Sequence, residues 1–199
     1  MTKRPVLPIL FLAFLPVAAR GQAGGENYVM AGPAFGSNET LGGGSVAITG
    51  STGFSNVFGF AFPVARKSAA TLWVEPFSLV FASPGGTSAT PGQANANSIL
   101  WTPSARLMIP LAPRITVFGA AGGGGGDFHN YALTPYAPPQ LKTESAYHGV
   151  FSAGGGVDFR IAKRFSIRVD ARDYITGRKL GGVNGRNHFL PMLGFVLHY

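Results

Sequence analysis

The chain has 199 residues, which is enough for one domain and leaves little room for a second. Only 12% of its residues are charged, against about 25% in an average soluble domain, so a charged surface does not cover this protein. It has no cysteine, which excludes disulfides, thiolate catalysis and cysteine-based zinc sites.

Residues 1–23 are predicted to form a secretory signal peptide. Met1–Arg4 carries two positive charges, the apolar segment Val6–Ala19 contains two prolines, and small residues follow. The apolar core is shorter than the roughly 20 residues that a membrane helix needs. We therefore expect export, cleavage after Ala19 or Ala23, and one domain spanning residues 24–199.

Beyond this segment the sequence alternates with a period of two and shows no sustained helical period. The predicted strands are Asn27–Gly36, Gly53–Pro63, Ala69–Ala82, Ile99–Ile109, Arg114–Gly125, Tyr147–Phe159, Phe165–Tyr174 and His188–Tyr199. Short connectors (Val64–Ser68, Pro110–Pro113, Ile161–Arg164) alternate with longer ones (Ser37–Thr52, Ser83–Asn97, Gly126–Ala146, Thr176–Asn187). Short turns at one rim and long loops at the other predict an all-β fold, an eight-stranded antiparallel up-and-down transmembrane β-barrel.

One predicted strand disturbs the alternation. Glu75 shares its face with Trp73, Phe77, Leu79 and Phe81, so an inward Glu75 would bring large apolar groups inside with it. A bulge near Pro76 would swap the faces beyond it, because one extra residue shifts the parity.

The charge pattern predicts which face meets lipid. In Phe165–Tyr174, apolar side chains alternate with charged ones, and a charge at the bilayer midplane costs about 2–4 kcal/mol, so the charged face points inward. We expect an ionic network in the lumen formed by Glu75, Arg106, Asp158, Arg160, Arg168, Asp170 and Arg172. It would act as a structural plug or, alternatively, as a gate along a narrow conductance path.

The last strand carries a resemblance to a known family. Its alternating apolar positions Leu193, Phe195 and Leu197 end in the aromatic Tyr199. Together with the signal peptide and the eight-strand rhythm, this resembles the small outer-membrane β-barrel superfamily of porin-like and OmpA/OmpX-type barrels, in which a terminal Phe is commoner. The resemblance implies a protein of a Gram-negative-type outer membrane that contacts its lipid. It also implies that the barrel assembly machinery reads the last strand, and that no peptidoglycan-binding domain follows.

Other sites are predicted to be absent. The net charge of +8 falls to +5 without the basic residues of the first 20, and the remaining bases form no continuous face, so we expect no nucleic-acid partner. His129, His148, His188 and His198 show no metal-ligand spacing on one element, so we expect no metal site. We expect no cofactor, no enzymatic activity and a monomer.

Three functional interpretations remain open. The first is an integral barrel with a structural, surface-interaction or weak pore role. The second is a lipid-modifying barrel similar to lipid-A deacylases, which would need an outward-facing Ser/His pair; the His-x-Ser-Asn pattern of that family is missing. The third is a secreted soluble lipocalin-like binder, which would need polar outward faces. Tyrosines of the connector Gly126–Ala146 suit an aromatic girdle better than recognition of a ligand.

Overall fold

A computed structural model describes residues 24–92, 96–183 and 187–199; the predicted signal peptide lies outside them. The strands are β1 Glu26–Phe35, β2 Glu39–Leu41, β3 Val46–Lys67, β4 Ala70–Thr87, β5 Ser98–Trp101, β6 Ser104–Ala112, β7 Ile115–Leu133, β8 Leu141–Ala162, β9 Phe165–Thr176 and β10 Asn187–His198. A single 3₁₀ turn, η1, spans Gly42–Gly44. No helix in the described ranges is long and apolar enough to cross a membrane.

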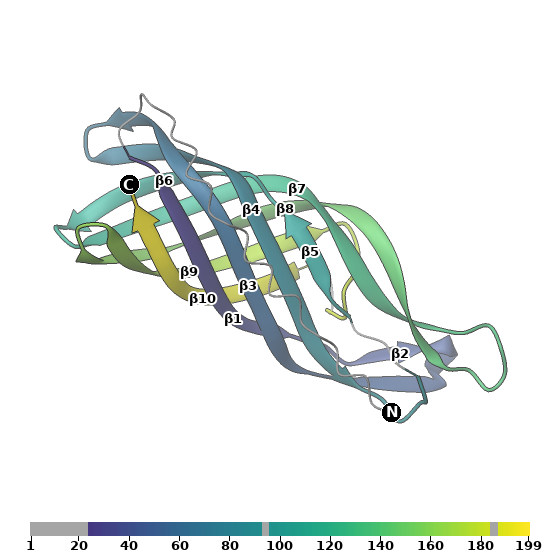
Figure 1. The fold of residues 1–199 in the computed structure, drawn as a ribbon. Coiled ribbons are helices and arrows are strands. Elements are labelled where there is room, and N and C mark those ends of the chain that lie inside the picture. Colours follow the sequence, from purple (N-terminus) through teal and green to yellow (C-terminus); the bar gives the residue numbers. More distant parts are fainter. Residues whose placement is uncertain (1–23, 93–95, 184–186) are drawn as a thin grey trace.

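The strands close into a ring (Figure 1). Each pairs antiparallel with its neighbours, and β1 pairs with β10 from Glu26↔His198 to Ala31↔Leu193. β5 and β6 both pair with β4 and β7, so they are two parts of one interrupted strand. β2 pairs only with β3, beside the ring. The predicted eight-stranded, antiparallel, up-and-down barrel is confirmed.

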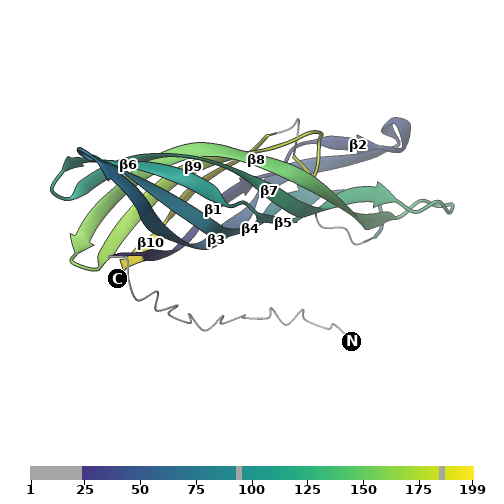
Figure 2. The ribbon, with the colours of Figure 1, turned by 90° about the horizontal axis from the view of Figure 1, so that it is seen from above.

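As predicted, the three short connectors lie together at one rim of the barrel. The turns at residues 68–69, 113–114 and 163–164 lie at one rim, together with the start of β1 and the end of β10 (Figures 1 and 2). Ser68 has a φ of 51° in the first of these turns. We call this rim the short-turn end and the opposite rim the loop end.

The long connectors are shorter than predicted. β3 begins at Val46 and not at Gly53, and β7 and β8 pair out to Leu133↔Leu141, which leaves residues 134–140 as the connector. Figure 1 shows this hairpin and the β2 region projecting at the loop end. The prediction was wrong because segments with many turn-forming residues were interpreted as loops, whereas here the strands continue to pair beyond the barrel and pack Ile48, Tyr131 and Leu141 together.

The bulge near Pro76 is confirmed. β3 and β4 pair at Phe60↔Phe77 and next at Phe62↔Val74, so one residue of β3 faces two of β4, Glu75 and Pro76. Glu75 is buried in the lumen, and beyond the bulge the buried positions are Ser78, Val80 and Ala82. The extra residue shifts the alternation of faces by one position, so Phe77, Leu79 and Phe81 lie on the outer face of the barrel.

The barrel has an apolar outside and a mixed inside. Exposed large apolar side chains occur on every strand of the ring except β7, whose exposed positions are Gly119, Ala121 and Gly123; they include Val29, Phe58, Leu72, Leu107, Phe151, Val169, Leu193 and Phe195. Inside, the loop-end half is filled by a buried apolar cluster that contains Leu100, Phe128, Tyr174 and Leu180, the last from the connector after β9. The half nearer the short turns holds the charged residues.

Candidate functional site in the barrel interior

Asp158, Arg168 and Glu26 begin a chain of alternating charges across the lumen. Arg168 holds Asp158 through two contacts of 2.6 Å, from Nε to Oδ1 and from Nη2 to Oδ2. Its Nη1 lies 2.8 Å from Oε1 of Glu26. Arg106 approaches the same Oε1 with its own Nη1 at 2.7 Å. Glu26 on β1 therefore joins an arginine of β6 to an arginine of β9.

The chain continues from Arg106 to Asp170. Arg106 Nε lies 3.0 Å from Oε2 of Glu75. Arg172 donates to both carboxylate oxygens of Glu75, at 3.0 and 3.2 Å, and its Nε lies 3.0 Å from Oδ2 of Asp170. Tyr28 also donates a hydrogen bond to Glu75. We call the seven linked residues Asp158, Arg168, Glu26, Arg106, Glu75, Arg172 and Asp170 the ionic network.

Alternation is what makes these buried charges tolerable. Every member of the ionic network is buried, and a buried charge without a partner is strongly destabilising. Each arginine here lies between two carboxylates, which leaves the three guanidiniums and four carboxylates with a net charge of −1. The rings of Tyr28 and Phe118 add cation–π contacts with Arg106 and Arg168, with ring centroids 4.9–5.6 Å away.

The structure brings together six of the seven predicted network residues: Glu75, Arg106, Asp158, Arg168, Asp170 and Arg172. Arg160 is exposed and lines a cavity at the short-turn end instead. Sequence reasoning missed Glu26 and Tyr28. Glu26 stands one residue before the predicted start of the first strand, and its alternation with Tyr28 and Met30 is the signal that would have placed it inside.

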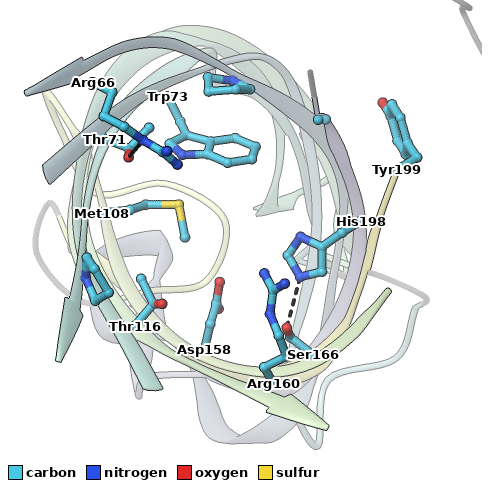
Figure 3. A pocket seen from close by; sticks show the side chains of 14 residues that line it. Arg66, Thr71, Trp73, Met108, Thr116, Asp158, Arg160, Ser166, His198 and Tyr199 are labelled. Atoms are coloured by element: carbon cyan, nitrogen blue, oxygen red, sulfur yellow. Dashed lines mark hydrogen bonds between the residues drawn. The ribbon is translucent and has the colours of Figure 1, made fainter. Parts of the chain in front are cut away.

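The cavity occupies about 360 Å³ at the short-turn end. Arg66, Trp73, Met108 and Thr116 line one side, and Asp158, Arg160, Ser166 and His198 line the other (Figure 3). Ser166 Oγ and His198 Nε2 share a hydrogen bond of 2.8 Å. His198 Nδ1 lies 3.8 Å from Oε2 of Glu26.

This serine, histidine and carboxylate stand in the order used by serine hydrolases, but three features argue against that chemistry. Ser166 is only 1% exposed, which leaves little room for a carbonyl group to approach its oxygen. Glu26 is already paired with two arginines. The pair also faces the lumen, whereas a lipid-modifying barrel would need it on the outside. The contact is better suited to fixing the end of β10 against β9.

The four histidines occupy separate environments. His188 is buried against Phe128, with ring centroids 5.4 Å apart. His129 Nδ1 lies 2.6 Å from Asn97 Oδ1. Within the described ranges, no three His, Cys, Asp or Glu side chains are placed to hold a metal ion.

The tyrosines near the loop end do not all form a girdle. Tyr147 and Tyr136 are exposed, but Tyr131 is buried with Ile48 and Ala96 at the loop end. β7 stays paired with β8 beyond Asp127 as far as Leu133. Tyr131 therefore lies within the strand, and its side chain joins this small cluster. The girdle interpretation is therefore wrong for Tyr131.

The C-terminal strand presents the predicted face. Leu193, Phe195, Leu197 and Tyr199 are all exposed on the outside of the ring, while Leu190, Met192 and Val196 are buried inside. The outer side chains of β10 are thus available to lipid or to another protein along the whole strand.

A closed ring of tilted strands, apolar outside and charged inside, defines a transmembrane type of β-barrel. No protein-family model and no curated protein matches this sequence. Neisserial surface protein A is similar over 87% of this chain and 96% of its own, with 9% identity and a TM-score of 0.55. OprG, an outer-membrane protein from Pseudomonas aeruginosa, is similar over 90% of this chain and 98% of its own, with 10% identity and a TM-score of 0.50. The chain has the fold of the small eight-stranded outer-membrane barrels.

Proposed function

We propose that this chain is an integral outer-membrane β-barrel protein with a structural or surface-interaction role, exported by a signal peptide in residues 1–23. The observation that carries the proposal is the inverted distribution of side chains. Apolar side chains such as Phe58, Leu107 and Phe195 are exposed on the outside, while the seven charges of the ionic network are buried inside. A lipocalin-like soluble binder would have the opposite arrangement, since its outer face meets water.

The filled interior favours a structural role over a pore. Above the ionic network, Leu100, Phe128 and Tyr174 are fully buried, and Leu180 reaches into the same cluster from the connector after β9. Eight strands leave an interior that side chains can fill completely. We infer that the lumen is closed between the cavity at the short-turn end and the loop end.

The loop-end hairpins are the proposed surface for recognition. Outer-membrane barrels place short turns in the periplasm and long loops outside the cell. In that orientation the paired extension of β7 and β8 stands in the external medium, with the exposed Tyr136 near its tip. We infer that contacts with other molecules at the cell surface involve this hairpin and the β2 region.

Assembly is proposed to begin at β10. Its outer face, with Leu193, Phe195, Leu197 and Tyr199, would be recognised by the barrel assembly machinery, and the closed ring supports a monomer. No cofactor or catalytic activity is part of the proposal.

The first experiment is fractionation of a Gram-negative host that expresses the whole chain. We expect the protein in the outer membrane, resistant to alkaline extraction, with a folded band that changes mobility on boiling. Amino-terminal sequencing should find a mature start at Arg20 or Gly24. A soluble periplasmic protein, or a band indifferent to heat, would overturn the proposal. In planar bilayers we expect no large steady conductance, and such a conductance would contradict the closed interior.

A further inference from the structure

Acidic and basic residues are distributed unevenly between the two ends of the barrel. All eight acidic residues of the chain are described: four belong to the ionic network, and the others, Glu39, Asp127, Glu144 and Asp173, lie in the loop-end half. Six basic residues are exposed at the short-turn end; they are Arg66, Lys67, Arg114, Arg160, Lys163 and Arg164. We call these six residues the cationic rim. No exposed acidic residue lies beside them.

The cationic rim accounts for the positive charge of the barrel. The ionic network has a net charge of −1. In the loop-end half, the four acidic residues face three described bases, Lys142, Arg178 and Lys179, which again gives −1. The described residues carry twelve bases and eight acids, a net charge of +4, so the six charges of the rim exceed the whole net charge. Such a one-sided distribution creates a local positive potential.

The rim begins where the apolar outer face ends. Val64, Leu111, Ile161 and Phe165 are exposed apolar residues close to the three short turns, and a base of the rim stands within three residues of each. At about 3.3 Å per residue along a strand, each of these bases lies within roughly 10 Å of the apolar edge. Long basic side chains at that level reach the headgroup region of a bilayer while their stems stay in contact with apolar surface.

We propose that the cationic rim binds the phosphate groups of anionic phospholipids in the leaflet that surrounds the short-turn end. This inference rests on the proposed function, because it needs the barrel to be inserted in a bilayer. Guanidinium and ammonium groups donate strong hydrogen bonds to phosphate, and no exposed aspartate or glutamate side chain competes for them at this rim. Arg66 and Arg160 line the cavity inside the mouth, and the other four bases, Lys67, Arg114, Lys163 and Arg164, are exposed on three turns around it, which fits a ring of lipids better than one soluble polyanion.

The test measures lipid selectivity with the full mature chain in phosphatidylcholine vesicles. Trace amounts of spin-labelled phosphatidylglycerol or spin-labelled phosphatidylcholine report, by electron paramagnetic resonance, the fraction of each lipid immobilised at the protein. We expect a preference of about threefold for the anionic label at low salt, which falls at high salt because the attraction is screened.

Two triple variants with equal charge loss locate the effect. Arg114→Gln, Lys163→Gln and Arg164→Gln remove half of the rim; Lys142→Gln, Arg178→Gln and Lys179→Gln remove the described bases of the loop end. The rim variant should lose most of the preference and the loop-end variant should keep it. If the rim triple does not insert, the double variant Arg66→Gln with Lys67→Gln replaces it, and we then expect a smaller loss of the preference.

Insertion into vesicles of phosphatidylcholine alone is measured first, by the change in gel mobility on boiling. This measurement tests the proposed membrane barrel separately from its lipid selectivity. An inserted barrel with equal affinity for both labels would overturn the cationic rim as a lipid site. So would equal losses in the two triple variants. Displacement of the labelled anionic lipid by millimolar soluble polyphosphate would instead identify a site for soluble polyanions and overturn the lipid assignment.

Discussion

Gly59 of β3 leaves the space into which the phenol ring of Tyr28 of β1 extends. The two residues are direct partners in the β1–β3 ladder, and a Cβ added at Gly59 would overlap the ring and the hydroxyl group. Beyond Gly59 the ring lies beside the guanidinium groups of Arg106 and Arg168 and donates to Glu75. A glycine on the sheet thereby positions the aromatic group that contacts both arginines.

Gly59→Ala should therefore destabilise the barrel. The methyl group would displace Tyr28 from Glu75, and overpacking of this kind costs about 1–3 kcal/mol of the free energy of unfolding. Reversible urea unfolding in vesicles measures the loss. Gly119→Ala is the matched control, because a Cβ at Gly119 meets nothing within 4 Å, and we expect a change within about 0.5 kcal/mol. Equal effects of the two substitutions would contradict this account.

Removal of Arg168 should be partly rescued by removal of Asp158. Arg168→Met leaves Asp158 unpaired and makes the net charge of the ionic network more negative, from −1 to −2, which we expect to cost about 3–5 kcal/mol of the free energy of unfolding. Adding Asp158→Asn restores the net charge, so the double variant should be more stable than the single one. A double-mutant cycle by urea unfolding gives the coupling energy. Additive losses would show that the two residues act independently.

Deletion of Pro76 should abolish folding. Without the bulge, either Glu75 or the segment from Phe77 to Phe81 is turned to the wrong face. The heat-modifiable band should be lost. Deletion of Gly43, which lies exposed in η1 with nothing within 4 Å of its ideal Cβ, serves as the control and should leave that band in place. A folded barrel after deletion of Pro76 would refute the parity argument.

A charge introduced on the outer face should destabilise the barrel only where that face lies within the membrane. Leu193 is 59% exposed near the middle of β10, and Tyr136 is 78% exposed in the connector between β7 and β8. Leu193→Arg should reduce the stability of the inserted barrel by about 2–4 kcal/mol, while Tyr136→Arg should have little effect. Urea unfolding in vesicles compares the two. Similar behaviour would mean that β10 does not face lipid.

Ser166 should not react with a fluorophosphonate probe. Its hydroxyl is buried and hydrogen-bonded to His198, and the carboxylate behind that histidine belongs to the ionic network. Mass spectrometry of the folded protein after treatment with the probe is the measurement. Labelling that disappears in Ser166→Ala would make the cavity a hydrolytic site.

Alternation in the sequence was sufficient to predict the strands and their faces. Period-two patterns such as Phe165–Tyr174 depend on burial alone, and the conflict at Glu75 required the bulge that the structure contains. Composition was less informative about strand length, since much of the segment 126–146, which was predicted to be a connector, pairs as strands in the projecting hairpin.

The contacts inside the lumen were harder to predict. Alternation shows that Arg106 points inward, but its partners depend on the stagger between strands that are not neighbours. Glu26 is a single charge at a strand end, so nothing in its local sequence indicated two arginine partners from β6 and β9. Arg160 has inward parity but lies too close to the short-turn end to join them.

The junction of β1 and β10, where the first and last strands close the ring, affects the kinetic stability of the folded barrel. β1 and β10 share only six paired residues, whereas β7 and β8 share nineteen. Inside the lumen, Glu26 at the first position of β1 forms ion pairs with Arg106 of β6 and Arg168 of β9. Sideways release of β1 into the bilayer would have to break both arginine contacts at once and carry a bare carboxylate toward hydrocarbon. The shortest ladder between neighbouring full strands is thus locked by ion pairs, and spontaneous opening at that point should be slow.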